Sequence, residues 1–111
     1  MAVNLERHAV SEAIAAGETV VLEVLPEPYW VKEHLPGARN LPIDEIEARV
    51  AQLLASVDTP VILYCANRAC RNSTQAAARL EQLGYRRVFT YKDGKQDWIE
   101  AGEPVERSAE A

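Results

Sequence analysis

The sequence predicts an α/β protein with a parallel sheet that helices cover on both faces. Three short runs rich in β-branched and aromatic residues, at positions 19–25, 61–64 and 87–91, are typical of buried strands. Two longer segments, 43–54 and 73–83, repeat apolar residues at the spacing of a helix face. Because these strands and helices alternate, they predict right-handed βαβ units, in which functional sites form beyond the carboxyl ends of the strands.

Shorter elements complete the expected order. Residues 5–16 predict an amphipathic helix, and residues 29–34 predict one or two helical turns after two prolines end the first strand. Residues 38–41 predict a short strand, and residues 95–101 predict a last short helix. The final residues, from about 105 to 111, are small and charged, so we expect a frayed tail there.

Two polar residues in these elements need an explanation. Glu23 lies inside the first of the three strands, where a carboxylate is costly unless it is hydrogen-bonded or faces a cleft. We therefore expect Glu23 to hold a neighbouring loop. His34 comes just before a Leu-Pro-Gly turn, and this position suits an anchoring hydrogen bond better than general-base catalysis.

The composition limits the classes of protein. A length of 111 residues suits one domain, which we place at residues 1–111, and 48% hydrophobic with 26% charged residues is ordinary for a globular chain. The formal net charge of −5 argues against nucleic acid or an anionic membrane as the main partner, although a local cationic site can still hold an anion. The chain has no signal-like start and no apolar stretch of about 20 residues, so we expect a cytoplasmic protein.

The central strand, loop and helix place a cysteine where a reactive thiol is favoured. Cys65 follows the strand at 61–64, and the loop after it leads into the helix that starts near Ser73. Backbone N–H groups and the positive end of that helix favour a thiolate, and Arg68 and Arg71 lie in the same loop. We therefore expect Cys65 to have a lowered pKa and to act as a nucleophile, the alternative being an inert core thiol.

The second cysteine, Cys70, lies in the same loop. Two cysteines with His8 and His34 lack the spacing of a zinc site, and we expect no metal. Cys70 is then either a passive loop residue, the default for such a position, or a resolving thiol that attacks a sulfenate or persulfide on Cys65. If the loop curls around an anion, its two ends approach bridging distance, and a reversible, strained Cys65–Cys70 disulfide becomes a further expectation.

The order of the motifs resembles that of the single-domain rhodaneses, which are sulfurtransferases that carry sulfur as a cysteine persulfide. The similarity covers nearly the whole chain and is carried by VVLEVL, EHLPGARNLPIDEI, VILYC, STQAAARLEQLGY and VFTYKDGKQDWIEAGEPVE. The resemblance implies a three-layer α/β/α domain with a central five-stranded, mostly parallel sheet. It also implies that Cys65 is the nucleophile that accepts sulfur.

The resemblance further implies a reaction and a substrate loop. Sulfane sulfur would move from a small anionic donor, such as thiosulfate or mercaptopyruvate, to a thiol or cyanide-like acceptor, which includes a protein thiol. No cofactor is implied. The N–H groups of the loop would hold the sulfur, and we expect Arg71 more than Arg68 to contact the donor. The implied loop consists of Ala66, Asn67, Arg68, Ala69, Cys70 and Arg71.

Departures from the family pattern leave other activities open. The first strand usually ends in Asp-Val-Arg but reads Glu-Val-Leu at 23–25, and the Gly that usually precedes the His is Glu33. The usual Cys-x4-Arg loop carries Cys70 at its last position, with Arg71 one residue later. As Cys-x5-Arg it resembles the loops of rhodanese-fold phosphatases and arsenate reductases, and as Cys-x4-Cys it resembles a less familiar subset of rhodanese-like proteins. A redox or sulfur-binding module is a further alternative.

Overall fold

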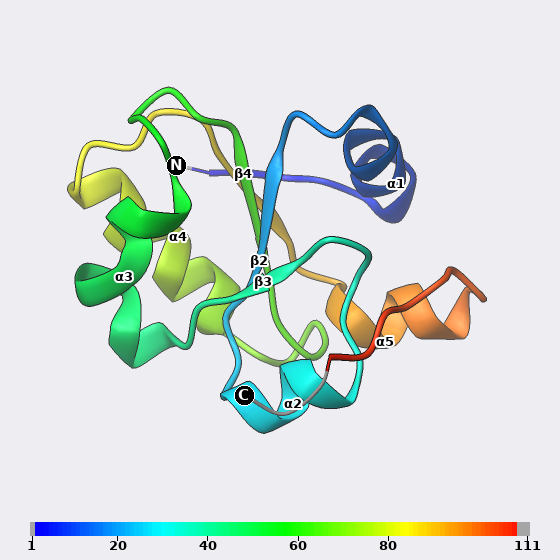
Figure 1. Cartoon of the computed structure of the whole chain (residues 1–111). Helices are drawn as coiled ribbons and strands as arrows, with labels where there is room; N and C mark the ends of the chain where they lie inside the picture. The colour runs from blue at the N-terminus through cyan, green and yellow to red at the C-terminus, as the bar shows by residue number, and fades with distance from the viewer. Residues whose placement is uncertain (1, 109–111) are drawn as a thin grey trace.

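The computed structural model describes residues 2–108 and confirms the three-layer α/β/α architecture (Figure 1). Its strands are β1 Val3–Asn4, β2 Val20–Glu23, β3 Arg39–Asn40, β4 Val61–Tyr64 and β5 Val88–Tyr91. Within the described residues these five strands form one sheet in the order β1-β5-β4-β2-β3. Every neighbouring pair is parallel, so the sheet that we expected to be mostly parallel is entirely so in this range.

Helices cover both faces of the sheet, as expected. Figure 1 shows α3 and α4 on one side of the strands, α1 and α5 on the other, and α2 near one end. Each helix agrees with its predicted segment to within a few residues, except that the third starts with a 3-10 turn, η1. The bounds are α1 Arg7–Ala16, α2 Glu27–Lys32, η1 Ile43–Glu45, α3 Ile46–Leu53, α4 Asn72–Gln82 and α5 Gly94–Glu100.

The edge strand β1 is an addition to the expected elements. Val3 pairs with Phe89, and Asn4 pairs with Thr90. The side-chain oxygen of Asn4 also accepts a hydrogen bond from the backbone N–H of Lys92 at 2.8 Å. Two exposed residues are too few to show the alternation that marks a strand in a sequence, so pairing with β5 creates this strand.

The position of β4 in the middle of the sheet explains why its sequence is apolar throughout. Val61, Leu63 and Cys65 belong to the core cluster that includes α3 and α4, whereas Ile62 and Tyr64 belong to the cluster that includes α1 and α5. Both faces of the strand are covered, so neither face takes polar residues. Cys65, the first residue after the strand, continues the alternation and points to the α4 side.

The first turn of α5 packs directly on the segment that follows β4. The N–H groups of Lys95 and Gln96 donate to the carbonyl oxygens of Cys65 and Ala66, at 2.9 and 2.8 Å. Gly94 has a φ of 71°, and a Cβ at this position would lie 2.6 Å from the Cys65 carbonyl oxygen. Glycine alone combines this backbone conformation with so close an approach.

The C-terminal segment differs from the frayed tail that we expected from about residue 105. Glu106 and His34 exchange backbone hydrogen bonds at 2.8 and 2.9 Å, and the N–H of Ser108 donates to the carbonyl oxygen of Val31. Val105 packs against the cluster around α1 and α5. The expectation rested on composition, which does not encode backbone pairing with a distant segment. Residues 109–111 lie outside the described range.

Replacing Gly94 with Ala should destabilise the fold more than the same change at Gly102. Both glycines have positive φ, 71° and 80°, but a Cβ at Gly102 would meet no atom within 4 Å. We expect Gly102→Ala to cost about 1–2 kcal/mol from backbone strain, and Gly94→Ala about 1–3 kcal/mol more from overpacking. Urea denaturation of both variants measures the difference, and equal costs would show that α5 moves off the loop without penalty.

Candidate active site

The candidate site lies where β2, β4 and β5 end, next to α2 and the first turn of α5 (Figure 1). All three strands run in the same direction, so their carboxyl ends meet at one edge of the sheet. The loop of residues 65–71 crosses this edge and joins β4 to α4. The structure therefore brings the predicted site residues to the edge that the βαβ order indicated.

Cys65 is completely buried at the start of this loop, and its thiol donates to the carbonyl oxygen of Cys70 at 3.4 Å. The hydroxyl oxygen of Ser73, in the first turn of α4, lies 3.8 Å from the sulfur. Ser73 is also buried, so its hydroxyl faces the sulfur and not solvent. Sequence reasoning used Ser73 only to start the helix, although its place just after the cysteine loop was a signal for this contact.

The pKa of Cys65 is raised from 9.0 to about 11. Burial is the main cause, since a thiolate loses its hydration there, and a hydrogen bond with the Cys70 side chain raises the pKa further. Hydrogen bonds from the backbone and hydroxyl of Ser73 lower it but do not offset the burial. The lowered pKa that we expected is therefore wrong for this conformation, because the sequence indicates a helix end but not the depth of the thiol.

The loop uses its N–H groups in a way that we did not expect. Those of Ala69 and Cys70 donate to the side-chain oxygen of Asn67 at 3.0 and 3.2 Å, and that of Cys70 also meets the Asn67 carbonyl oxygen at 3.0 Å. Asparagine commonly closes a turn in this manner. These two N–H groups are therefore not aimed at Cys65, and the expected cradle of N–H groups is wrong for them in this conformation.

The two loop arginines have different environments. Arg68 is 68% exposed, and its Nε and Nη2 lie 2.7 and 2.6 Å from a carboxylate oxygen of Asp93. Arg71 is the exposed residue that precedes α4. In residues 2–108 neither guanidinium has a hydrogen bond with the Cys65 sulfur, and neither is among the causes of its pKa shift. The expectation that these arginines favour the Cys65 thiolate is therefore not met.

A cavity of about 330 Å³ lies beside the second thiol. Its lining has three basic side chains and no acidic one, which suits a small anion. Lys92 was missed in the sequence analysis, although its place directly after β5 put it at the same sheet edge. Cys70, which is partly exposed, contributes to this cavity. The lining consists of Arg68, Cys70, Arg71, Thr74, Gln75 and Lys92.

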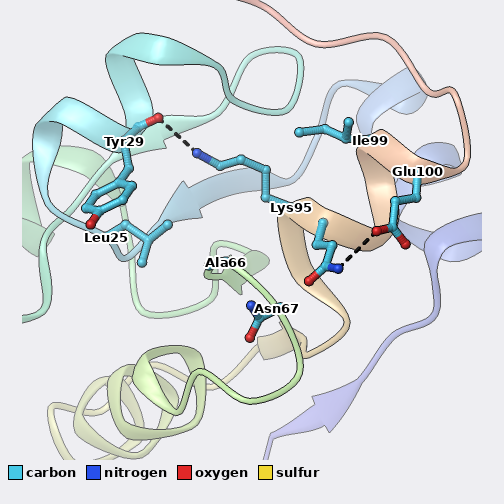
Figure 2. Close-up of a pocket in the computed structure, with 8 residues that line it drawn as sticks. Leu25, Tyr29, Ala66, Asn67, Lys95, Ile99 and Glu100 are labelled. Carbon is cyan, nitrogen blue, oxygen red and sulfur yellow. Dashed lines mark hydrogen bonds between the residues drawn. The ribbon is translucent and has the colours of Figure 1, made fainter.

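A second cavity of about 350 Å³ involves the start of the same loop (Figure 2). Figure 2 shows the Lys95 ammonium group directed at the carbonyl oxygen of Tyr29, and a bond between Gln96 and Glu100. Tyr29 and Ile99 at the rim are 58% and 37% exposed. The lining residues are Leu25, Tyr29, Ala66, Asn67, Lys95, Gln96, Ile99 and Glu100.

A buried ion pair lies under this second cavity. Glu23 is fully buried and accepts hydrogen bonds from the Tyr64 hydroxyl at 2.7 Å and the Lys95 ammonium at 3.0 Å. Lys95 also donates to the Tyr29 carbonyl oxygen at 2.9 Å. Burial raises the pKa of Glu23, and the bonds from Tyr64 and Lys95 oppose that rise. We expected Glu23 to hold a neighbouring loop, but its side chain bonds to Tyr64 on β4 and Lys95 on α5. It reaches the loop after α2 only through the Tyr64 hydroxyl, which accepts the N–H of Leu35.

His34 has the anchoring role that we expected. Its Nδ1 lies 2.8 Å from the Trp30 carbonyl oxygen, and its ring stacks on Trp30 with centroids 4.5 Å apart. The Trp30 indole in turn donates to the carbonyl oxygen of Ala38. His34 therefore stabilises the end of α2 and the turn that follows it.

The described residues hold neither a metal cluster nor a membrane helix. No group of three or more His, Cys, Asp or Glu side chains in residues 2–108 is placed to bind a metal ion. Across the same residues, no helix has both the length and the apolar character needed to cross a membrane. Cys65 and Cys70 are both free thiols.

The structure defines a class of α/β domain in which a cysteine follows the central strand of a parallel sheet and begins the loop to the next helix. Comparison with known families gives the name of this class. The model of the Rhodanese-like domain matches residues 6–101, so the chain belongs to the rhodanese-like family. The structure is similar to that of a Bacillus halodurans protein, with a TM-score of 0.87 and 28% identity over 96% of this chain and 77% of the other.

The curated relatives differ in their described roles. A sulfurtransferase of Allochromatium vinosum is 30% identical over 92% of this chain and 92% of its own length. An HTH-type transcriptional regulator of Mycobacterium tuberculosis is 34% identical over 85% of this chain, which spans only 40% of the regulator. A thiosulfate sulfurtransferase of Escherichia coli is 38% identical over 58% of this chain and 59% of its own length. Sulfurtransferases are therefore among the relatives.

Replacing Lys95 with Met should destabilise the fold and make its stability depend on pH. Glu23 would lose its cation, and breaking such a buried pair costs about 3–5 kcal/mol. The pKa of Glu23, already raised from 4.5 by burial, would rise further, so the folded variant would bind a proton that the unfolded chain has released. Stability of Lys95→Met should therefore increase as pH falls from neutral toward 4.5.

Urea denaturation at several pH values, with the double variant Glu23→Gln/Lys95→Met as control, tests this. The double variant has no buried carboxylate and should lose the added pH dependence. If Lys95→Met matches the wild type at all pH values, Lys95 does not compensate the charge of Glu23.

Proposed function

We propose that this protein is a sulfurtransferase that takes sulfane sulfur from a small anionic donor, such as thiosulfate, onto Cys65 and passes it to a thiol acceptor. The observation that carries the proposal is the position of Cys65, which follows the central strand, contacts Ser73 at the start of α4, and lies one loop away from the cationic cavity. Sulfurtransferases among the relatives support it. Two free thiols suit a reducing compartment such as the cytoplasm.

The proposed transfer has two displacement steps. The Cys65 thiolate attacks the outer sulfur of thiosulfate, the sulfur–sulfur bond of the donor breaks, and sulfite leaves with the electron pair, so that Cys65 carries a persulfide. An acceptor thiolate then attacks the outer sulfur of the persulfide and restores the Cys65 thiolate. Ser73 supports both steps, since its N–H and hydroxyl oppose the rise in the Cys65 pKa.

Activation of Cys65 has to accompany donor binding in this proposal. With a pKa of about 11 the resting thiol is protonated at neutral pH, and it is fully buried. A donor anion in the cavity beside Cys70 would meet the cations of Arg71 and Lys92. Rotation of the Cys70 carbonyl away from Cys65 would open the path to the thiol and free the sulfur from its present hydrogen bond.

An oxyanion enzyme of the phosphatase or arsenate-reductase type fits the loop less well. Such chemistry needs several loop N–H groups and a bidentate arginine around one oxyanion. Here Asn67 occupies the N–H groups of Ala69 and Cys70. Arg68 is paired with Asp93. A redox or sulfur-binding module remains the second candidate, because the loop carries two free thiols.

Incubation of Cys70→Ser, in which Cys65 is the remaining thiol, with thiosulfate should add the mass of one sulfur atom to Cys65, and Cys65→Ser should take up none. The initial rate should rise with pH above neutrality without levelling off there, because the resting pKa of Cys65 is about 11. Peptide mass spectrometry and sulfite release measure both results. Circular dichroism of Cys65→Ser checks the fold, and sulfite release by that folded variant at the wild-type rate would overturn the assignment.

Arg71→Ala and Lys92→Ala should each raise the donor KM more than Arg68→Ala. Losing one charge-assisted hydrogen bond costs about 1.5–3 kcal/mol, which corresponds to a rise of about 10- to 150-fold. Arg68 should matter less because Asp93 offsets its charge. Steady-state kinetics with thiosulfate measure the effect, and Arg39→Ala, an exposed change on β3, is the control. Unchanged KM in both Arg71→Ala and Lys92→Ala would place the donor elsewhere.

A further inference from the structure

The second cysteine lies next to the first. The Cys65 thiol donates to the backbone carbonyl of Cys70 at 3.4 Å, and the Cys70 side chain is among the causes that raise the pKa of Cys65. Cys70 packs against the core cluster to which Cys65 belongs, while part of its surface lines the cationic cavity. The Cys70 side chain thus bridges the buried thiol and the surface.

The loop conformation holds the second thiol in this position. Asn67 accepts the N–H groups of Ala69 and Cys70 through its side chain, which curls the loop and brings Cys70 back over Cys65. If these N–H groups pointed at Cys65, the Cys70 side chain would face away from it. Because they bond to Asn67 instead, the loop geometry allows the two thiols to meet.

We propose that Cys70 discharges the Cys65 persulfide as sulfide and closes a Cys65–Cys70 disulfide. The Cys70 thiolate attacks the sulfur atom of Cys65 itself, a bond forms between the two cysteine sulfurs, and the bond to the outer sulfur breaks. The outer sulfur leaves as hydrosulfide with the electron pair, and the Cys70 proton passes to solvent. This inference rests on the proposed function, because it requires a persulfide on Cys65.

The surroundings of Cys65 favour discharge over storage of the persulfide. An anionic persulfide is poorly solvated at a fully buried position, and the carbonyl oxygen of Cys70, 3.4 Å from the Cys65 sulfur, repels an anion. Hydrosulfide that leaves past Cys70 enters the cavity lined by Arg71 and Lys92, where its charge is stabilised. Ser73 is the donor that the buried site offers the bound anion, it does not offset the burial, and the adjoining cavity attracts the released anion.

Turnover then requires a dithiol reductant. A dithiol of small-molecule or protein type would exchange with the Cys65–Cys70 disulfide, become a disulfide itself, and return both cysteines to thiols. Over one cycle the donor would lose one sulfane sulfur atom, which would be reduced to sulfide. The two electrons for this reduction would come from the dithiol, which becomes a disulfide. On this route the thiol acceptor of the proposed function is a dithiol, which becomes oxidised while the sulfur leaves as sulfide.

Single-turnover reactions of wild type, Cys70→Ser and Cys65→Ser with thiosulfate, in the absence of other thiols, test this inference. Wild type should release one equivalent of sulfide per chain, lose both thiols and show a Cys65–Cys70 disulfide in peptide mass spectrometry. Cys70→Ser should release no sulfide and keep the persulfide on Cys65. Adding dithiothreitol to the oxidised wild type should restore both thiols. Cys70→Ala serves as a second variant if the serine at this position disturbs the fold.

The outcomes separate this inference from the proposed function. If folded Cys70→Ser and Cys70→Ala take up no sulfur on Cys65, and wild type takes up none either, the proposed sulfur transfer fails. If wild type keeps a Cys65 persulfide beside a free Cys70 thiol and releases no more sulfide than Cys70→Ser, sulfur transfer stands and the inference is overturned. A persulfide found on Cys70 of wild type would also overturn it, since Cys70 would then have attacked the outer sulfur.

Discussion

The packing of α5 on the segment after β4 is the contact on which the candidate site depends. Two backbone hydrogen bonds join Lys95 and Gln96 to the carbonyl oxygens of Cys65 and Ala66. They form only because Gly94 lets the backbones approach closely. The same turn places the Lys95 ammonium against Glu23, so one helix start fixes both the cysteine backbone and the buried carboxylate. The later part of the loop is held by the turn that Asn67 closes and by the pair of Arg68 with Asp93.

Burial sets the chemistry of the site more than proximity to cations does. Cys65 has a helix start nearby and two arginines in its loop, yet its pKa rises because the sulfur is desolvated. Glu23 shows the same balance and the same direction, since burial raises its pKa although the hydrogen bonds from Tyr64 and Lys95 oppose the rise. In the proposed function, movement of the Cys70 carbonyl exposes this buried thiol to the donor.

Within the rhodanese-like family, the second cysteine distinguishes the loop of this chain from the usual Cys-x4-Arg pattern. The relatives include sulfurtransferases and a transcriptional regulator, so the family scaffold serves more than one role. In this chain the loop carries Cys70, and the adjoining cationic cavity is lined by Arg68, Arg71 and Lys92.

The sequence by itself determined the layers, the parallel sheet and the place of Cys65 at the end of β4, because buried strands and amphipathic helices leave strong local patterns. It also indicated that Glu23 would be hydrogen-bonded, since a carboxylate inside a buried strand allows few alternatives. Only the tertiary structure decided the raised pKa of Cys65, the turn made by Asn67, the presence of Lys92 in the cavity and the pairing of Glu106 with His34. Except for the Asn67 turn, which is local, these features depend on contacts between segments far apart in the chain and on the depth of burial that they create, which no local pattern records.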